Sequence, residues 1–322
     1  MFQHIYIEYA LVILDDMSYT RKEFLQNSAV LFVAAITNSA FTQEKINKPL
    51  LAFSTLGCPD WTFEQIADFA LQNGYQGLEV RGIKREMDLT RCSEFSSPEK
   101  IKTTLELMNA RGLKFVNLGA SAKMHFHEGL DREKNLSEAK AFIDLAQKLE
   151  CPFVRVFPNN FPKDRERDQT IRTVADNLLI LGDYAKDRNV TVLLETHGDF
   201  SKSGDILEVM KAAKHPNIGL VWDIANMWTI TKEAPIEVYH KLKKYIRHTH
   251  IKDAKIIGNK LQYTLLGRGD VPIFEAIDIL SKDRYSGYLS FEWEKLWHPE
   301  IMEPEIALAD YPKVMQKHFD LK

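Results

Sequence analysis

Short apolar runs alternate with longer amphipathic segments along the chain from about residue 50 onward. The runs are rich in β-branched and aromatic residues, whereas the segments between them repeat apolar residues at helical spacing, which indicates strands alternating with helices. Eight runs follow one another, at residues 50–56, 77–82, 114–121, 153–159, 191–198, 218–226, 246–253 and 287–294. This series of strand–helix units predicts an α/β protein in which residues 49–322 form a single (β/α)8 TIM barrel.

An open doubly wound sheet is the alternative arrangement for alternating strands and helices. Such a sheet usually carries a GxGxxG turn after its first strand, and no such turn follows the first apolar run of this sequence. Several helical segments begin with a Ser, Thr, Asn or Asp residue that can cap free backbone amides. The closed barrel is therefore the expected fold, and its chemistry is expected at the C-terminal ends of the strands.

Residues 1–48 do not continue this alternation and are interpreted as an N-terminal extension. From Met17 onward, two basic residues precede an apolar stretch at 29–36, and small residues follow it. This order is typical of a secretory signal, and the apolar stretch is too short to span a bilayer. The letters TRKEFL resemble a twin-arginine signal with Lys22 at the second arginine position. We expect a start at Met17 and export to the periplasm; the alternative is an amphipathic helix on the barrel of a cytoplasmic protein.

The charge balance argues against a nucleic-acid partner. The chain has 42 basic and 45 acidic residues, which gives a formal net charge of -3. It therefore lacks the excess of Lys and Arg with which proteins bind the phosphate backbone of nucleic acids. The three cysteines, Cys58, Cys92 and Cys151, share no CxxC or zinc-ligand spacing, so we interpret them as packing residues. No membrane partner is expected once the signal is removed, and a homo-oligomer is left open.

Four consecutive strand runs end on residues that bind divalent metals: Glu195, Asp223, His250 and Glu292. Each one alone is explained by a helix cap, a surface charge or a buried histidine. Together they would place three carboxylates in one barrel mouth, where they would repel one another unless a cation neutralised them. An oxygen-rich set with one imidazole suits one divalent ion, for which we expect Mn²⁺, with Mg²⁺, Co²⁺ or Zn²⁺ as alternatives.

These residues lie within longer motifs of a known family. In order, the chain carries LAFSTLGCPDWTFEQ, LLETHG, GLVWDIAN, HTHIKD, LLGRGDVPIFEAI and FEWEKLWHPEI. From residue 50 to about residue 310 it resembles the sugar phosphate isomerase/epimerase family with the xylose isomerase-like TIM barrel. The resemblance implies that Glu195, Asp223, His250 and Glu292 hold the metal. It also implies that the two glutamates flank a sugar and exchange a proton with a carbon next to its carbonyl.

The chemistry of a polarised carbonyl is consistent with this implication. A cation that stabilises an enediolate makes the neighbouring carbon-bound proton removable by a carboxylate. We therefore expect a metal-dependent sugar isomerase or epimerase with Glu195, Glu292 and His197 as catalytic residues. The alternative is a lyase or dehydratase that acts by β-elimination on 3-keto-glycosides or keto sugars, which export would favour.

The substrate is expected to be a small sugar or keto-sugar, and several residues near the strand ends are candidates to bind it. They are Arg81, Asn226, Lys252, Trp297 and His298. The epimerases of the family often carry a substrate-binding histidine where this chain has Asn226, which weakens the case for ketose epimerisation. A related DNA endonuclease family has a trinuclear zinc site and needs a basic groove, which the near-neutral charge opposes. A sugar-binding protein without turnover is the non-enzymatic alternative.

Overall fold

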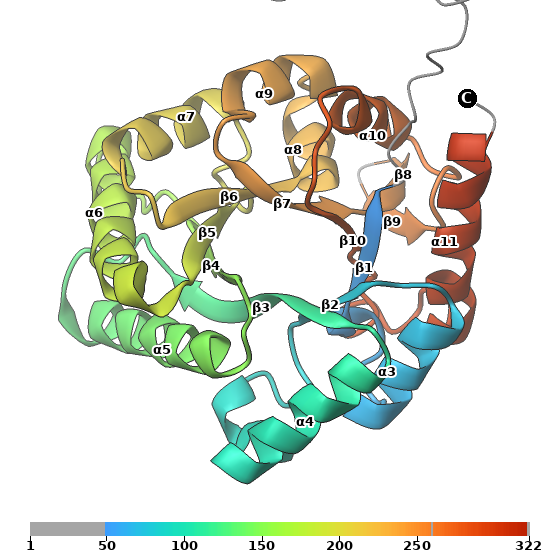
Figure 1. Ribbon diagram of the computed structural model, residues 1–322. Helices are drawn as coiled ribbons and strands as arrows, with labels where there is room; N and C mark the ends of the chain where they lie inside the picture. Colours follow the sequence, from blue (N-terminus) through green and yellow to red (C-terminus); the bar gives the residue numbers. More distant parts are fainter. Residues whose placement is uncertain (1–48, 259, 321–322) are drawn as a thin grey trace, which may run out of the picture. The chain divides into compact units, whose positions relative to one another are not determined.

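The computed structural model describes residues 49–258 and 260–320, which contain a closed barrel of parallel strands (Figure 1). Around the barrel the strands follow the order β1-β10-β7-β6-β5-β4-β3-β2, and every neighbouring pair is parallel. Their bounds are β1 (Leu50–Ser54), β2 (Gly77–Val80), β3 (Lys114–Lys123), β4 (Phe153–Phe157), β5 (Thr191–Glu195), β6 (Ile218–Asp223), β7 (Ile246–Ile251) and β10 (Tyr288–Phe291). The predicted (β/α)8 barrel is confirmed, and each predicted strand run coincides with one barrel strand, although β3 extends two residues beyond its run.

Helices surround the barrel, as the ring of coils in Figure 1 shows. Their bounds are α3 (Phe63–Gln72), α4 (Pro98–Ala110), α5 (Gly129–Lys148), α6 (Arg167–Ala185), α7 (Ser203–Ala212), α8 (Ile224–Thr231), α9 (Pro235–Leu242), α10 (Ile273–Lys282) and α11 (Pro304–Asp320). Short 3-10 turns occur at η1 (Thr55–Gly57), η2 (Leu89–Arg91), η3 (Ser93–Phe95) and η4 (Lys186–Arg188). Within the described ranges, no helix combines the length and apolar character needed to cross a bilayer.

Local sequence signals explain where several helices begin. Thr62 caps α3 through a reciprocal capping box with Gln65, so two otherwise free amides are bonded. Ser97 caps α4, whose first position is a proline that has no amide hydrogen to satisfy. These signals set the helix starts independently of the barrel that the helices cover.

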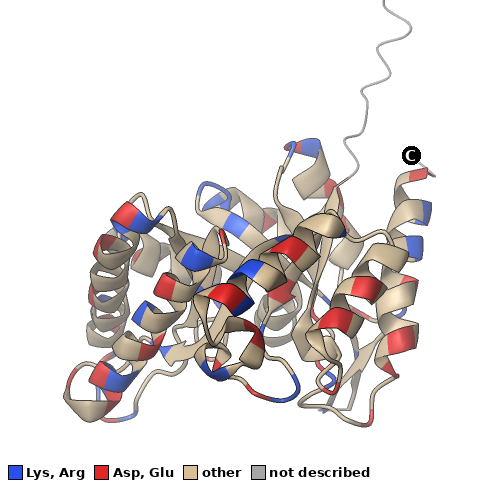
Figure 2. Ribbon diagram, turned by 60° about the horizontal axis from the view of Figure 1, so that its bottom comes forward, with Lys and Arg blue, Asp and Glu red and all other residues tan. Residues whose placement is uncertain are grey.

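The core lies between the strands and the inner faces of the helices. Strands such as β2 and β6 are buried along their whole length, as expected for parallel strands covered on both faces. Figure 2 shows that Lys, Arg, Asp and Glu are interspersed over the surrounding helices and loops. The three cysteines are buried and free, in agreement with their interpretation as packing residues.

A two-stranded hairpin after β7 was not predicted. Its strands, β8 (Asp253–Ile257) and β9 (Lys260–Thr264), pair antiparallel and form a separate sheet. The Asp253 carboxylate accepts hydrogen bonds from the amides of Ala254, Gly269 and Val271, which ties the hairpin to the following loop. The predicted run at 246–253 contains β7 and ends on Asp253, the first residue of β8.

The predicted N-terminal extension, with its export signal and start at Met17, lies outside the described residues. The described chain begins at residue 49, and β1 starts at Leu50.

Candidate metal centre

The four predicted metal ligands come together at the C-terminal ends of adjacent strands. Glu195 ends β5, Asp223 ends β6, His250 lies near the end of β7, and Glu292 directly follows β10. All four side chains are buried, and each offers one ligand atom within 4.8 Å of the others. The barrel order places these strands side by side, so that residues about 100 positions apart in sequence become neighbours.

The Nδ1 atom of His250 is at the centre of this group. It lies 3.7 Å from Glu195 Oε1, 3.6 Å from Asp223 Oδ2 and 3.4 Å from Glu292 Oε1. It is buried and makes no hydrogen bond within the protein. Separations of this size suit atoms that share one ion through bonds of about 2.0–2.2 Å. The donor set therefore fits a single divalent cation.

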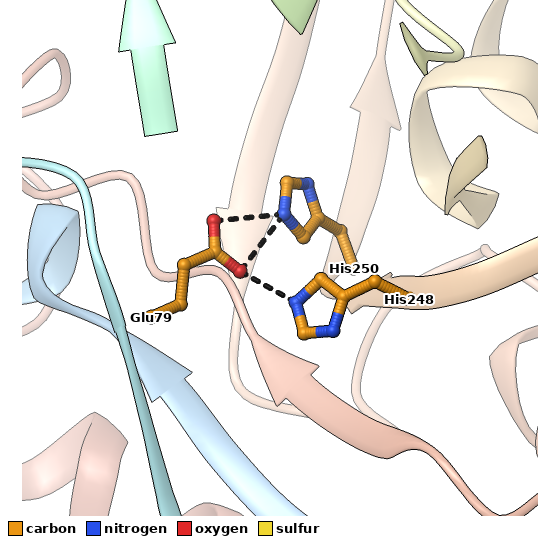
Figure 3. A group of neighbouring side chains, drawn as sticks. All are labelled: Glu79, His248 and His250. Carbon is orange, nitrogen blue, oxygen red and sulfur yellow. Dashed lines mark hydrogen bonds and ion pairs between the residues drawn. The ribbon is translucent and has the colours of Figure 1, made fainter. Parts of the chain in front are cut away.

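Glu79 on β2 holds the opposite ring nitrogen of His250, as Figure 3 shows. The Nε2 atom of His250 lies 3.0 Å from Glu79 Oε1, and His248 Nε2 lies 2.7 Å from Glu79 Oε2. Ser290 also donates a hydrogen bond to this carboxylate at 3.1 Å. Glu79, His248 and His250 could by themselves hold an ion, but their polar atoms already bond to one another. We therefore interpret Glu79 as the group that orients His250.

Two buried cations neutralise the carboxylates of the site. Arg155 Nε on β4 lies 3.0 Å from Glu195 Oε2. Lys252 Nζ lies 2.8 Å from Asp223 Oδ2 and 2.6 Å from both Glu292 Oε2 and Glu294 Oε1. The predicted substrate contact Lys252 is thus engaged by three carboxylates, two of which belong to the metal set.

The two glutamates of the metal set have different environments. Burial raises the pKa of Glu195, but Arg155 and His250 more than offset it, so that this pKa lies below its ordinary value. Burial raises the pKa of Glu292 to about 7, although His250 and Lys252 oppose the shift. The two carboxyl groups therefore differ in their electrostatic surroundings, which lower the pKa of Glu195 and raise that of Glu292.

The other predicted catalytic residue, His197, lies just beyond the end of β5. The strand ends at Glu195, so the alternation that would place both side chains on one face stops short of His197. Its ring lies 4.6 Å from the ring of Phe157, and its Nδ1 makes no hydrogen bond within the protein. A contact between His197 and a substrate stays a prediction.

The remaining predicted substrate contacts lie at different distances from the metal set. Arg81 is 6% exposed and directly follows β2. Asn226 lies in the first turn of α8, where its backbone N–H donates a hydrogen bond to Asp223 Oδ1. Trp297 is 54% exposed. The ring of His298 contacts Tyr263, while its Nδ1 pairs with Glu300. The structure brings Arg81, Asn226 and Lys252 to the strand ends, and places Trp297 and His298 in the loop after β10.

Sequence reasoning did not assign roles to Glu79, His248 or Arg155. Each is a charged or titratable residue inside an apolar strand run, which is a usable signal because such residues are rarely buried without a partner. The identity of the partner was not accessible from spacing, since Glu79 and His250 are 171 residues apart.

Comparison with known proteins identifies the family to which this barrel belongs. Residues 67–314 match the family described as xylose isomerase-like TIM barrel. A 3-dehydroshikimate dehydratase of Bacillus anthracis is 22% identical over 77% of this chain and 91% of that protein. An inosose isomerase of Halalkalibacterium halodurans is 22% identical over 79% of this chain and 92% of that protein. A crystal structure of an IolI protein with a bound zinc atom superimposes with a TM-score of 0.67 at 18% identity, over 83% of this chain and 96% of that one.

Proposed function

Because the chain belongs to the xylose isomerase-like TIM barrel family, we propose that it is a divalent-metal-dependent enzyme that removes a proton next to the carbonyl of a small polyhydroxylated ketone. The observation that carries this proposal is the unpaired, buried Nδ1 of His250 facing three carboxylate oxygens. Arg155 and Lys252 balance part of the charge of these three carboxylates, and a divalent cation at the Nδ1 of His250 would supply the partner that this atom lacks.

Glu195, Asp223, His250 and Glu292 would hold the metal, and the oxygen-rich set favours Mn²⁺ among the divalent ions. When bound, the cation polarises the substrate carbonyl and so acidifies the neighbouring carbon-bound proton. The relative with a bound zinc atom keeps Zn²⁺ as the main alternative.

The residues of the chain then supply the proton transfer. Glu195 and Glu292 occupy the two ends of the arc formed by β5, β6, β7 and β10. Arg155 fixes the Glu195 carboxylate, and Lys252 holds Glu292 in place. In this proposal one glutamate accepts the proton, and the other returns one to the second carbon or to the opposite face.

The first candidate outcome is isomerisation or epimerisation of a keto sugar, in which the proton returns to carbon. The second is β-elimination, in which the same carbanion equivalent expels a neighbouring hydroxyl or glycosidic group. The dehydratase name of one relative and the isomerase name of the other support both outcomes equally. Asn226, at the position where epimerases of the family often carry histidine, favours the second outcome.

The experiment is to incubate purified protein and Mn²⁺ in D₂O with free ketoses, an inosose, 3-dehydroshikimate and a 3-keto-glycoside, and to follow each by NMR. Both outcomes should remove the carbon-bound proton next to the carbonyl: deuterium replaces it where a proton returns to carbon, and a double bond replaces it where a neighbouring group is expelled. An epimer or isomer signal then identifies the first outcome, and loss of water or of the aglycone identifies the second.

A Glu292→Gln variant should lose at least a hundredfold in turnover, as expected when a general acid–base group is removed. Exposed Glu106 provides the control substitution, Glu106→Gln, which should keep full activity. A fully active Glu292→Gln enzyme would remove Glu292 from the mechanism. The absence of both deuterium exchange and elimination with every substrate in the presence of metal would contradict the proposed chemistry.

A further inference from the structure

Gly119 on β3 leaves a gap that two arginine side chains fill. A Cβ at this position would lie 2.6 Å from Arg81 Cδ and 2.8 Å from Arg155 Nη2. Arg81 follows β2 and Arg155 lies on β4, the two strands that flank β3 in the barrel. Any residue larger than glycine would therefore displace one of these side chains, because real Cβ atoms do not approach so closely. Glycine at position 119 thus allows the side chains of two arginines to pack beside the proposed metal centre.

The two guanidinium groups differ in their partners. Arg155 forms an ion pair with Glu195 and donates to the carbonyl of Ala120. Arg81 donates only to neutral acceptors, the carbonyl of Gly119 at 3.2 Å and the hydroxyl of Ser121 at 2.9 Å. Among the residues that the structure describes, no carboxylate lies within ion-pair distance of Arg81. Arg81 is nevertheless only 6% exposed.

The surroundings of Arg81 make its charge costly. Burial, together with the neighbouring Arg155, lowers the pKa of Arg81 to about 9, although Glu195, Glu138 and Glu292 act in the opposite direction. A desolvated guanidinium is stabilised when an anion pairs with it, and its planar fork matches a carboxylate. The side chains of Arg81 and Arg155 both lie close to Gly119, and Arg155 pairs with Glu195 of the metal set, so Arg81 lies next to the proposed metal centre.

We propose that Arg81 binds a carboxylate of the substrate, and hence that the substrate is a keto-polyol bearing one acid group. This inference rests on the proposed function, which it narrows from polyhydroxylated ketones in general to acidic ones. It does not depend on whether the reaction is an isomerisation or an elimination.

The buried cations that lack an ion-pair partner indicate how much negative charge the acid group of the substrate carries. Lys252 is held by three carboxylates and Arg155 by Glu195, so that Arg81 alone remains to meet an incoming anion among the buried cations of the site. A single positive charge balances a carboxylate, whereas a phosphate dianion requires further cations. A monoanionic acid is therefore favoured over a phosphorylated sugar.

The test uses matched ligands that share a ring of hydroxyl groups. Quinate is a cyclohexane polyol with a carboxylate, myo-inositol lacks the carboxylate, and an inositol monophosphate carries a phosphate. Calorimetric titration into Mn²⁺-loaded protein should give at least about tenfold tighter binding of quinate than of myo-inositol, the size of a charge-assisted hydrogen-bonded pair.

In Arg81→Gln this preference should disappear, while the affinity for myo-inositol stays within about twofold. Arg81→Lys, which keeps the charge but loses the fork, should retain part of the preference and covers the case in which Arg81→Gln does not fold. Exposed Arg91 provides the control, since Arg91→Gln removes an arginine near the same rim and should leave the preference intact.

Absence of quinate binding to the wild type, a preference that persists in Arg81→Gln, or tighter binding of the inositol monophosphate than of quinate would each overturn the inference. Titration of the same samples with Mn²⁺ separates it from the proposed function. Protein that binds no metal contradicts the proposed function, whereas protein that binds metal without preferring the carboxylate contradicts only the role of Arg81.

Discussion

His250 uses its two ring nitrogens for different purposes. Nε2 bonds to Glu79, while Nδ1 faces the three carboxylates of the metal centre. The carboxylate fixes the proton on Nε2 and leaves the lone pair of Nδ1 for an ion, an arrangement that also makes the imidazole a stronger donor. Without an ion, burial lowers the pKa of His250, but Glu292, Glu79 and Glu195 hold it well above its usual range. Metal binding at this site therefore releases a proton.

We expect Glu79→Gln to weaken Mn²⁺ affinity by about tenfold to a hundredfold, because an amide can still hydrogen-bond to His250 but carries no charge to strengthen it. Competition against a fluorescent chelator measures the dissociation constant directly. The exposed substitution Glu106→Gln should change nothing. An unaltered affinity in Glu79→Gln would show that this carboxylate serves packing alone.

At the scale of elements, one side chain joins three helices behind the metal centre. Helix α7 has no cap from its own N-cap residue, Lys202. Glu233, in the loop after α8, instead accepts hydrogen bonds from the amide and hydroxyl of Ser203. Lys241 of α9 lies 3.4 Å from the same carboxylate. The α8–α9 loop thus replaces the missing local cap of α7.

Glu233→Gln should lower the free energy of unfolding by about 1 kcal/mol, the usual contribution of a helix N-cap. Burial raises the pKa of Glu233, but the bonds from Ser203 and the charge of Lys241 bring it below its ordinary value. A depressed folded-state pKa contributes stability above the unfolded pKa, and that stability is lost as the pH falls through the folded value. Urea denaturation should therefore separate the two proteins at pH 7, and the difference should shrink as the pH falls below the ordinary Glu pKa of about 4.3 and through the lower folded value. A difference that stays constant over this pH range would contradict the charged cap.

At the scale of the whole molecule, the candidate metal centre connects four adjacent strands, which make up half of the eight-stranded barrel. Its ligands come from β5, β6 and β7 and from the residue after β10, four adjacent positions in the closed sheet. Because the unfolded chain holds these ligands far apart, an ion binds the folded barrel in preference to the unfolded chain. Occupation of the centre is thereby coupled to global stability.

Addition of Mn²⁺ at about 100 times its dissociation constant should stabilise the metal-free protein by about 2.7 kcal/mol, which corresponds to roughly 5–10 °C in Tm. Differential scanning calorimetry with and without a chelator measures this shift. An Asp223→Asn variant should lose most of it, since the amide is a weaker ligand. A wild-type Tm that does not respond to any divalent ion would contradict the single-ion centre.

The predicted export signal also belongs to this scale. We propose that translation starts at Met17 and that the apolar stretch at 29–36 is removed on export. N-terminal sequencing of protein from the periplasmic and cytoplasmic fractions tests this, with a mature chain beginning after about residue 40 as the expected result. Exported protein that still carries residues 20–40 would refute the cleavage.

The sequence alone determined the barrel and grouped four candidate metal ligands. The alternation of apolar periods shows which faces are buried, and parallel strands bring their C-terminal ends to one mouth, so that Glu195, Asp223, His250 and Glu292 could be grouped before any contact was known. The tertiary structure alone decided the partners. Glu79 forms a hydrogen bond with His250 across the closed barrel, and the side chains of Arg81 and Arg155 pack together against Gly119. Such contacts depend on strand register and barrel closure, which bring together residues far apart in the chain and which a local period of two or 3.6 residues does not encode.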